Sequence, residues 1–550
     1  MMARSPRSAS RAGITFHHPI SFWAGTAAIS AGVILHLPDY LGAGAMGYHM
    51  AGMPRGGPMI LGMVLIVSGM AMAAFGLIPW RSTVDAGAVT PLTGVHVRAM
   101  DSAGLSRAHM GLLFVLGIAL IVDVMKPATL GFVIPGMRAE YGLSRGEVVA
   151  LPIAALAGTT LGSFLWGILA DRVGRRASIL LASLMFIGTA ICGFMPSFGW
   201  NLFMCFVMGT SAGGMLPIVY ALMAESIPAR KRGWLVVLHG GLATVGGYLV
   251  ASGLAALLEP HFAWRILWFA GLPTGLLVIV LNRWIPESPR FLLERGRIAE
   301  AEAVMARYGA VLERGGPVEV LPPPAVGAPP ATPRGLRLFR LFRAPYLPQT
   351  LTVGSYGLGW GLANWGFITF IPSILQERGV PVGDASRILF LSAVLAIPGT
   401  LLVSWLYGMW STKKSMIAFA LVTALSLVGF AVVDPGASGQ ESLWLGPLMV
   451  ILLIGSGGVI SMLSPYTAEV YPTDLRGTGS GFAAGSSKVG GVFGPPLMAA
   501  VVAAVPGFGV LGLLVAAPLV ASAVMLAVKG LETRDVGLEE VTRRNALPST

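Results

Sequence analysis

The sequence predicts an all-α membrane protein: two related six-helix bundles preceded by two additional transmembrane helices. Three observations lead to this prediction: a strongly apolar composition, recurring apolar runs of membrane-spanning length, and one motif that occurs twice at corresponding positions. Of the 550 residues, 55% are hydrophobic and 11% are charged, and the mean hydropathy is +0.75. Ordinary globular proteins have about 25% charged residues. This chain therefore has too few polar side chains to cover a surface in water, and most of its exterior must contact lipid.

The apolar runs set the number of membrane crossings, because a helix needs about 20 apolar residues to span the hydrocarbon core. The sequence has fourteen such runs, at residues 20–42, 58–79, 110–135, 148–170, 176–196, 199–224, 234–258, 264–285, 346–373, 386–409, 415–434, 442–468, 478–504 and 507–528. The first run is too long for the core of a secretory signal peptide and is interpreted as a retained membrane helix. A long polar segment divides the last twelve runs into two groups of six.

The expected organisation has five parts. An N-terminal extension with two transmembrane helices covers residues 1–108, and the first bundle covers 109–285. Residues 286–344 form a loop with an amphipathic stretch and a proline-rich linker. The second bundle covers 345–530, and a tail follows at 531–550. No role is assigned to the first two helices beyond docking on the core or stabilising it.

The net charge of +12 indicates membrane orientation. If the N-terminus is cytoplasmic, most of the 37 lysines and arginines fall on the cytoplasmic side, as the positive-inside rule requires. We therefore expect a multi-pass membrane protein with both termini cytoplasmic. The composition, rich in alanine, glycine and arginine, suggests a bacterial inner membrane, and we expect a monomer in the bilayer. No nucleic-acid partner is expected, because topology accounts for the positive charge.

Several function classes are disfavoured by what the sequence lacks. Its two cysteines lie in apolar runs, so there is no disulfide framework. No zinc or haem ligand pattern is visible, and no glycine-rich phosphate loop ending in GK[ST] occurs. We expect no metal or cofactor, no ATP-driven pump and no enzyme.

An internal repeat relates the two bundles. The pattern A-E-x-x-P-x-x-x-R-G contains Glu225 and Arg232 near the end of the fourth core helix, and it recurs with Glu469 and Arg476 near the end of the tenth. Chance would rarely place this pattern twice at matching positions, so the halves are interpreted as duplicates. Parallel halves with a site between them at the bilayer midplane are a known transporter plan.

A longer motif follows the second core helix. The string G-x-x-x-D-R-x-G-R-R is formed by Gly167, Asp171, Arg172, Gly174, Arg175 and Arg176. It resembles the signature loop of the major facilitator superfamily. The string P-E-S-P-R-F-L at 286–292 and the sequence near the chain end, L-E-T-R with L-E-E, resemble strings of its sugar porters and related organic-ion and aromatic-acid proton symporters. The resemblance covers about residues 109–540 and implies a major facilitator fold with alternating access.

The resemblance also implies a conformational latch. In this family the loop holds the two halves together in one state of the cycle, with Glu225, Arg232, Glu469 and Arg476 taking part. The corresponding loop of the second half, residues 408–414, lacks the Asp-Arg pair, so we expect a weaker latch there. The alternative is an ordinary basic cytoplasmic loop.

Two ionisable residues share the first core helix. Asp123 corresponds to the first carboxylate of the aromatic-acid transporter pattern that this segment resembles, and Lys126 replaces the second. Because ionisable groups inside a bilayer are costly, they are functional candidates. We expect Asp123 to carry a proton and Lys126 to bind substrate. A static pair is the alternative, because positions three apart share a helix face.

The remaining candidates are expected to bind substrate. Lys488 precedes two glycines in the eleventh core helix, where the resembling anion transporters also carry a basic residue; snorkelling to the interface is the alternative. His239 is a weaker candidate, since it could simply pack. The seventh core helix contributes an amide and three aromatic residues, which suit a ring-bearing acid or, for the tryptophans, a lipid interface: Tyr356, Trp360, Asn364 and Trp365.

Together, these features predict a secondary transporter that moves a small organic anion, an aromatic or other carboxylate, with protons. A neutral sugar or polyol porter and a drug exporter remain alternatives within the same fold. A receptor that binds without transporting is the alternative from another class.

Overall fold

The computed structural model describes residues 16–54, 56–78, 95–96, 104–310, 313–314, 339–377, 379–432, 442–471, 473–504 and 509–534. Thirteen helices in these ranges are long and apolar enough to cross a membrane. Helix α21 (Thr473–Ala504) covers the remaining expected run, so the predicted helical membrane fold is confirmed. The strands β1 (Val95–His96) and β2 (Glu313–Arg314) pair antiparallel.

The N-terminal extension forms a helical hairpin of α1 (Pro19–Ile34) and α3 (Gly57–Leu77), joined through α2 (Leu37–Gly42) and η1 (Ala43–Met46). Glycines set the close approach of its two long helices. A Cβ atom built on Gly25 would lie 2.5 Å from the carbonyl oxygen of Gly69, and one on Gly32 would lie 2.5 Å from that of Gly62. Small residues at such contacts let membrane helices pack backbone to backbone.

Replacing Gly25 by Val is expected to separate the hairpin helices and lower the thermal midpoint of unfolding. The added side chain has no room beside Gly69, and overpacking typically costs about 1–3 kcal/mol. Gly42→Val is the matched control, because a Cβ at Gly42 meets no atom within 4 Å. Equal midpoints for both variants would contradict this packing account.

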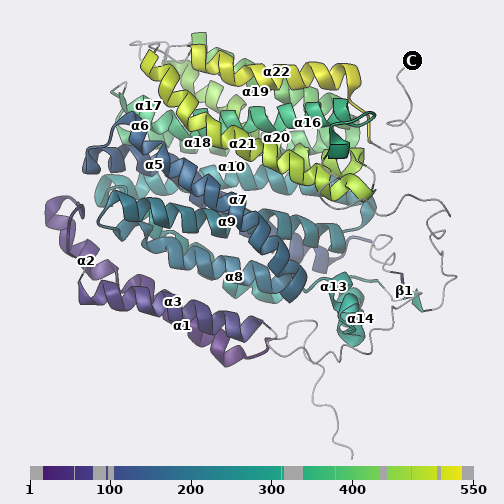
Figure 1. Ribbon diagram of the computed structural model, residues 1–550, viewed down its shortest axis with the longest axis horizontal. Coiled ribbons are helices and arrows are strands. Elements are labelled where there is room, and N and C mark those ends of the chain that lie inside the picture. The colour runs from purple at the N-terminus through teal and green to yellow at the C-terminus, as the bar shows by residue number, and fades with distance from the viewer. Residues whose placement is uncertain are drawn as a thin grey trace, which may run out of the picture.

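The first bundle follows the hairpin in the chain and packs beside it. Its elements are α5 (Arg107–Tyr141), α6 (Arg145–Val148), α7 (Ala150–Val173), α8 (Arg175–Gly188), η2 (Thr189–Phe194), α9 (Phe198–Ser226), α10 (Ala229–Phe262), α11 (Ile266–Phe269), α12 (Gly271–Val280) and η3 (Leu281–Trp284). Helices α1 and α3 both pack on α8. Figure 1 shows the hairpin on one side of the molecule and the second bundle on the other, with the first bundle between them.

The second bundle repeats this plan. Its elements are α16 (Leu347–Gly361), η4 (Leu362–Phe367), η5 (Ile368–Phe370), α17 (Ile371–Glu377), α18 (Val382–Trp405), η6 (Leu406–Trp410), α19 (Thr412–Val432), α20 (Ser442–Val470), α21 and α22 (Gly509–Lys529). In the sequence, the short helices α13 (Pro289–Glu294) and α14 (Ile298–Arg307) connect the two bundles and belong to the amphipathic stretch of the loop. The proline-rich stretch of the loop lies outside the described residues.

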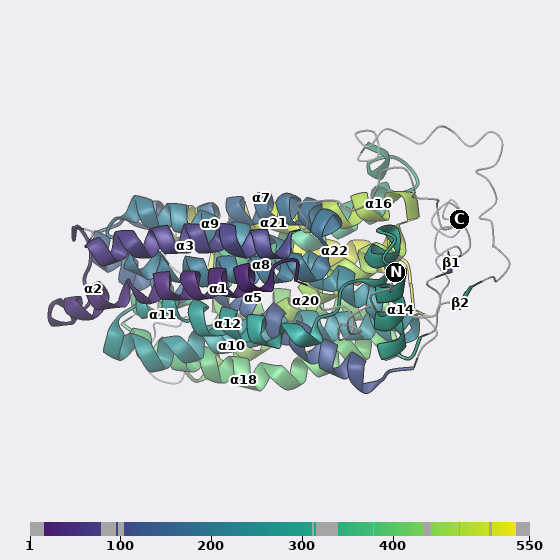
Figure 2. The ribbon, with the colours of Figure 1, turned by 90° about the horizontal axis from the view of Figure 1, so that it is seen from below.

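The two ends of the molecule are distinct. Helix α14 lies at one end, here called the latch end, with α13 beside it (Figure 1), and α2 lies at the opposite end, here called the far end (Figure 2). The bundles meet along a seam formed by α10 with α18, α7 with α21, and α5 with α17. At Gly131 of α5 the seam is tight, because a Cβ there would lie 2.6 Å from the carbonyl oxygen of Thr369.

Candidate functional site

The seventh core helix is interrupted at the seam. Helix α16 ends at Gly361, and η4, a π-helical segment, carries Asn364 and Trp365 before α17 resumes. Single π-helical turns are rare and often occur at functional sites. The hydroxyl of Thr369 donates to the carbonyl oxygen of Asn364 at 2.8 Å and so satisfies one backbone acceptor freed by the break.

Both residues of the break lie against the first bundle. The Tyr248 hydroxyl of α10 donates to Oδ1 of Asn364 at 3.4 Å. The Trp365 ring and Leu156 of α7 both lie beside Gly491 of α21, at 2.9 and 3.0 Å from where its Cβ would stand. The structure therefore places Asn364 and Trp365 at the boundary between the bundles, together with Tyr248, for which the sequence offered no signal.

Lys488 also lies at the seam and reaches across it. Its ammonium donates to the carbonyl oxygen of Thr159 at 3.3 Å and, through a short contact, to the hydroxyl of Ser163, both on α7. Both acceptors are neutral, and no carboxylate among the described residues lies within ion-pair distance of Lys488. A half-buried positive charge without a counter-ion is costly unless something else supplies the negative charge.

Asp123 is buried in α5, with 5% of its surface exposed. Its Oδ1 atom has no hydrogen-bond partner in the part of the chain that the structure describes. A buried polar group without a partner is uncommon and calls for an explanation. The Asp123 carboxyl is therefore free to gain and lose a proton without breaking an existing ion pair.

Lys126 does not pair with Asp123 in the described structure, which argues against the static-pair alternative. Its ammonium donates to the hydroxyl of Thr189 at 2.5 Å and to the carbonyl oxygen of Phe186, and it lies 5.3 Å from the Phe186 ring centroid. These partners belong to α8 and η2 of the first bundle. The long side chain thus turns into its own bundle, and the structure does not bring Lys126 together with Lys488.

The other expected site residues also lie within bundles. Both ring nitrogens of His239 contact carbonyl oxygens, Leu235 at 2.8 Å and Leu113 at 2.9 Å. A neutral imidazole donates from one nitrogen only, so both bonds form only when the ring is protonated. Tyr356 is fully buried and donates weakly to Met416 at 3.5 Å, and the buried Nε1 of Trp360 has no partner among the described residues.

The latch motif is organised around a carboxylate that follows the sixth core helix. Glu287 accepts the backbone N–H groups of Arg175 at 2.7 Å and Arg176 at 3.5 Å, at the start of α8. Burial raises the pKa of Glu287, although these hydrogen bonds act in the opposite direction. Arg175 also pairs with Glu225 at 3.3 Å and with Asp171 at 3.5 Å.

Glycine is required at one position of this motif and not at another. Gly174 has a φ of +104°, and a Cβ there would lie 2.2 Å from Oε2 of Glu287. At Gly167, in contrast, an added Cβ meets no atom within 4 Å in the described part of the chain. Among the described residues, Asp171, Arg175 and Arg176 contact the first bundle and its following loop, and the Arg176 guanidinium also lies 5.0 Å from the ring centroid of Phe16 in the N-terminal extension. None of these contacts reaches the second bundle.

The second bundle has an equivalent arrangement. Glu532, after the twelfth core helix, accepts the N–H of Thr412 at 2.9 Å and the hydroxyls of Thr412 and Ser411, at the start of α19. Glu469 accepts the hydroxyls of Thr533 at 2.6 Å and Tyr407 at 3.3 Å. The internal duplication therefore extends to a carboxylate that caps the third helix of each bundle.

Three latch residues remain to be placed. Arg172 accepts a backbone hydrogen bond at 2.8 Å from the guanidinium of Arg295, and Arg232 donates to the carbonyl oxygen of Ile227 at 3.0 Å. The side chain of Arg476 lies outside the described part of the chain.

Glu532→Gln is expected to lower the thermal midpoint at pH 7. Burial raises the pKa of Glu532, but the hydrogen bonds from Ser411 and Thr412 outweigh it, and the net shift is downward. A carboxylate with a lowered folded-state pKa stabilises the fold above its unfolded value of 4.5, and this stabilisation is lost as the pH falls through the folded pKa. The midpoints of wild type and variant should therefore converge as the pH falls below 4.5.

Glu300→Gln serves as the control for this prediction. It removes a partly exposed ion pair with Arg297, and such pairs contribute little. A pH-independent deficit in Glu532→Gln, or none at all, would show that the charge does not cap α19.

The two bundles pack along a seam that contains a broken helix, and each bundle has a capped loop. This architecture is typical of a membrane transporter. A family model for the Major Facilitator Superfamily matches residues 112–495, and the chain belongs to that superfamily. It is a multi-pass membrane transporter and not an enzyme, and the family resemblance of the sequence is confirmed.

Curated relatives are similar along most of the chain. The niacin transporter NiaP of Acinetobacter baylyi is 27% identical over 446 residues, which cover 81% of this chain and 99% of the relative. The 4-hydroxybenzoate transporter PcaK of the same organism is 26% identical, with 82% and 95% covered. The gallate transporter of Pseudomonas putida is 26% identical, with 77% and 92% covered.

Solved structures share the fold. The proton:xylose symporter XylE bound to 6-bromo-6-deoxy-D-glucose aligns with a TM-score of 0.61 at 19% identity, covering 79% of this chain and 98% of that chain. A partially occluded inward-open structure of XylE from E. coli gives a TM-score of 0.58 at 17% identity, covering 78% of this chain and 100% of that chain. At this identity the likeness concerns the fold alone.

Proposed function

We propose that this chain is a proton-coupled symporter of a small ring-bearing carboxylate, which works by alternating access as a monomer in a bacterial inner membrane. The observation that carries the proposal is Lys488. Its charge lies at the seam between two neutral oxygens and lacks a counter-ion in the described structure. A substrate carboxylate arriving at the seam would supply the missing negative charge.

The surroundings of Lys488 favour a planar substrate. Trp365 provides an aromatic face at the seam, and Asn364 provides an amide whose present partner is Tyr248 on the opposite bundle. Niacin, gallate and 4-hydroxybenzoate, named in three relatives, are each a ring with one carboxylate. These names support a ring monocarboxylate as the substrate class. Lys126 and His239, which lie within the first bundle, would act indirectly by holding its helices.

Proton coupling is assigned to Asp123. Its buried carboxyl has an oxygen without a partner among the described residues and forms no pair with Lys126. Protonation of this carboxyl would remove the cost of a buried charge while the bundles rearrange. The positive-inside distribution favours a cytoplasmic latch end and an external far end, so substrate and proton would be taken up together.

Uptake into proteoliposomes tests this function. The panel contains radiolabelled nicotinate, 4-hydroxybenzoate, gallate and xylose, with nicotinamide as the matched compound that keeps the ring and lacks the carboxylate. We expect carboxylate uptake that is stimulated when the outside is more acidic than the inside. Transport of xylose, or of nicotinamide as well as nicotinate, would contradict the proposal.

A further inference from the structure

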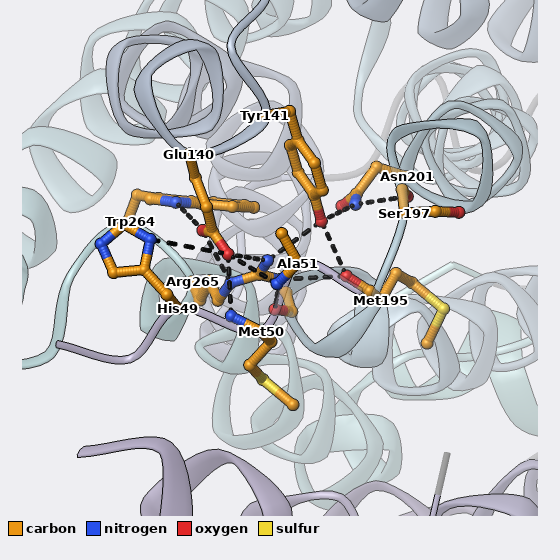
Figure 3. A network of polar contacts seen from close by, with 11 residues as sticks. His49, Met50, Ala51, Glu140, Tyr141, Met195, Ser197, Asn201, Trp264 and Arg265 are labelled. Carbon is orange, nitrogen blue, oxygen red and sulfur yellow. Dashed lines mark hydrogen bonds and ion pairs between the residues drawn. The ribbon is translucent and has the colours of Figure 1, made fainter. Parts of the chain in front are cut away.

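A buried ion pair at the far end also accepts hydrogen bonds from the hairpin loop (Figure 3). Glu140, in the last turn of α5, pairs with Arg265 at 2.5 Å, and their side chains are only 3% and 0% exposed. Oε1 of Glu140 also accepts the backbone N–H groups of Met50 at 2.8 Å and Ala51 at 3.0 Å. Oε2 accepts Nε of Arg265 and Nε1 of Trp264, each at 3.0 Å.

The hairpin is fixed at further points around this carboxylate. The N–H of Gly52 donates to the carbonyl oxygen of Pro196 at 2.9 Å, and the hydroxyl of Tyr40 donates to that of Phe262. These acceptors precede α9 and end α10. The loop of residues 47–52 is therefore tied to the end of α5 and to the segment before α9, and Tyr40 of α2 ties the hairpin to the end of α10.

The same turn of α5 also reaches the second bundle. Arg138, two residues before Glu140, pairs with Glu377 of α17 at 2.5 Å, and Arg145 pairs with the other oxygen of Glu377 at 2.9 Å. Both bonds cross the seam, and Gly131 and Thr369 lie in backbone contact deeper along it. We call Arg138, Arg145 and Glu377 the far-end gate.

A cavity of about 560 Å³ lies beside this gate. Its lining comes from all three parts of the molecule: Gly47 and His49 of the hairpin loop, Glu259 and Trp264 of the first bundle, and Asp384 and Arg387 of the second. The hairpin loop therefore borders the space between the bundles at the end where they would part.

We propose that the hairpin loop is a positioning element of the far-end gate. By donating two N–H groups to Glu140, it holds the last turn of α5 on the first bundle and so presents Arg138 and Arg145 to Glu377. Opening at the far end then breaks the bonds at Glu377, while α5, the hairpin and Arg265 move as one body. The extra helices are thus part of the gating machinery, a role that rests on alternating access but not on the identity of the substrate.

Cysteine accessibility tests this role without any substrate. Thr369→Cys places a thiol in the tight seam behind the gate, and the native Cys192 and Cys205 are buried. A membrane-impermeant maleimide is applied from each side of proteoliposomes. Thr369→Cys alone is the parent for all comparisons of labelling rate, and the chain without Thr369→Cys gives the background. Glu377→Gln, which weakens the gate directly, should raise the rate several-fold, because the pairs are partly exposed but one carboxylate holds two guanidinium groups across the seam.

Variants of the hairpin loop and of its acceptor Glu140 test whether the loop positions the far-end gate. Ala51→Pro removes one N–H donor, and Glu140→Gln removes the charge that both donors bind while keeping the side-chain size. Both should raise the labelling rate, and neither should add to the effect of Glu377→Gln, because all act on one gate. Gly42→Ala, in the same hairpin with open space around it, should leave the rate unchanged.

The inference fails if Glu140→Gln labels like the parent, or if its effect multiplies with that of Glu377→Gln. If Ala51→Pro does not fold, Met50→Pro, which removes the other N–H donor and leaves the Glu140–Arg265 pair intact, takes its place. A rise seen only from the cytoplasmic side would support the gate and contradict the proposed orientation, so the two proposals can fail separately.

Discussion

Replacing Lys488 by Gln is expected to raise the KM for a ring carboxylate roughly 30- to 100-fold. The ammonium lies at the seam with only the neutral oxygens of Thr159 and Ser163 as partners, so a substrate carboxylate gains a charge-assisted bond there. Such a bond in a half-buried site contributes about 2 to 2.7 kcal/mol, which corresponds to this change in KM. Initial uptake rates over a range of nicotinate concentrations measure the effect.

Two matched variants make the result specific. Lys488→Arg retains the charge and should keep the KM within several-fold of the wild-type value. Lys126→Gln removes the other intramembrane lysine, which is bound to Thr189 and Phe186, and should lower stability with little change in KM. An unchanged KM in Lys488→Gln would place the substrate carboxylate elsewhere.

Replacing Asp123 by Asn is expected to abolish accumulation against a gradient while leaving exchange across the membrane intact. If one proton accompanies one anion, each pH unit of acidity outside supports about tenfold accumulation, because one unit corresponds to about 1.36 kcal/mol. The amide cannot carry the proton, so the accumulation ratio should fall to about one at any pH gradient. Steady-state uptake at gradients of zero, one and two units measures this ratio.

Counterflow provides the control for this variant. Vesicles preloaded with unlabelled nicotinate should still exchange it for labelled nicotinate, since exchange requires no net proton movement. Loss of exchange together with accumulation would indicate damage to the site instead of uncoupling. Accumulation that still follows the pH gradient would assign the proton to another group, and His239, with its two carbonyl contacts, would be examined first.

The fold could be predicted from the sequence because a bilayer restricts the choices. Backbone polar groups have no water to bond in lipid, so long apolar runs must be helices, and counting them gives the architecture. The repeat around Glu225 and Glu469 then identified the two halves. The structure adds that Glu287 and Glu532 perform the same capping role, which the matching strings at 286–290 and 531–534 could have suggested.

The site was predictable only in part, because sequence spacing does not say where a long side chain ends. Asp123 and Lys126 are three residues apart on one helix, yet the lysine extends to carbonyl and hydroxyl oxygens of another helix in its bundle. The π-helical break at Asn364 contains no proline that would mark it. The bond from the hairpin loop to Glu140 joins residues about ninety positions apart, and no local pattern encodes it.

Proton-coupled symport is tested most directly by measuring whether a proton enters with the anion. A pH-sensitive dye trapped in proteoliposomes reports the internal pH after nicotinate is added at equal pH on both sides, with protein-free vesicles correcting for passive diffusion of the acid. Proton-coupled symport predicts internal acidification above this background for the wild type and none for Asp123→Asn. Nicotinate uptake by the wild type without acidification beyond the background would contradict proton-coupled symport.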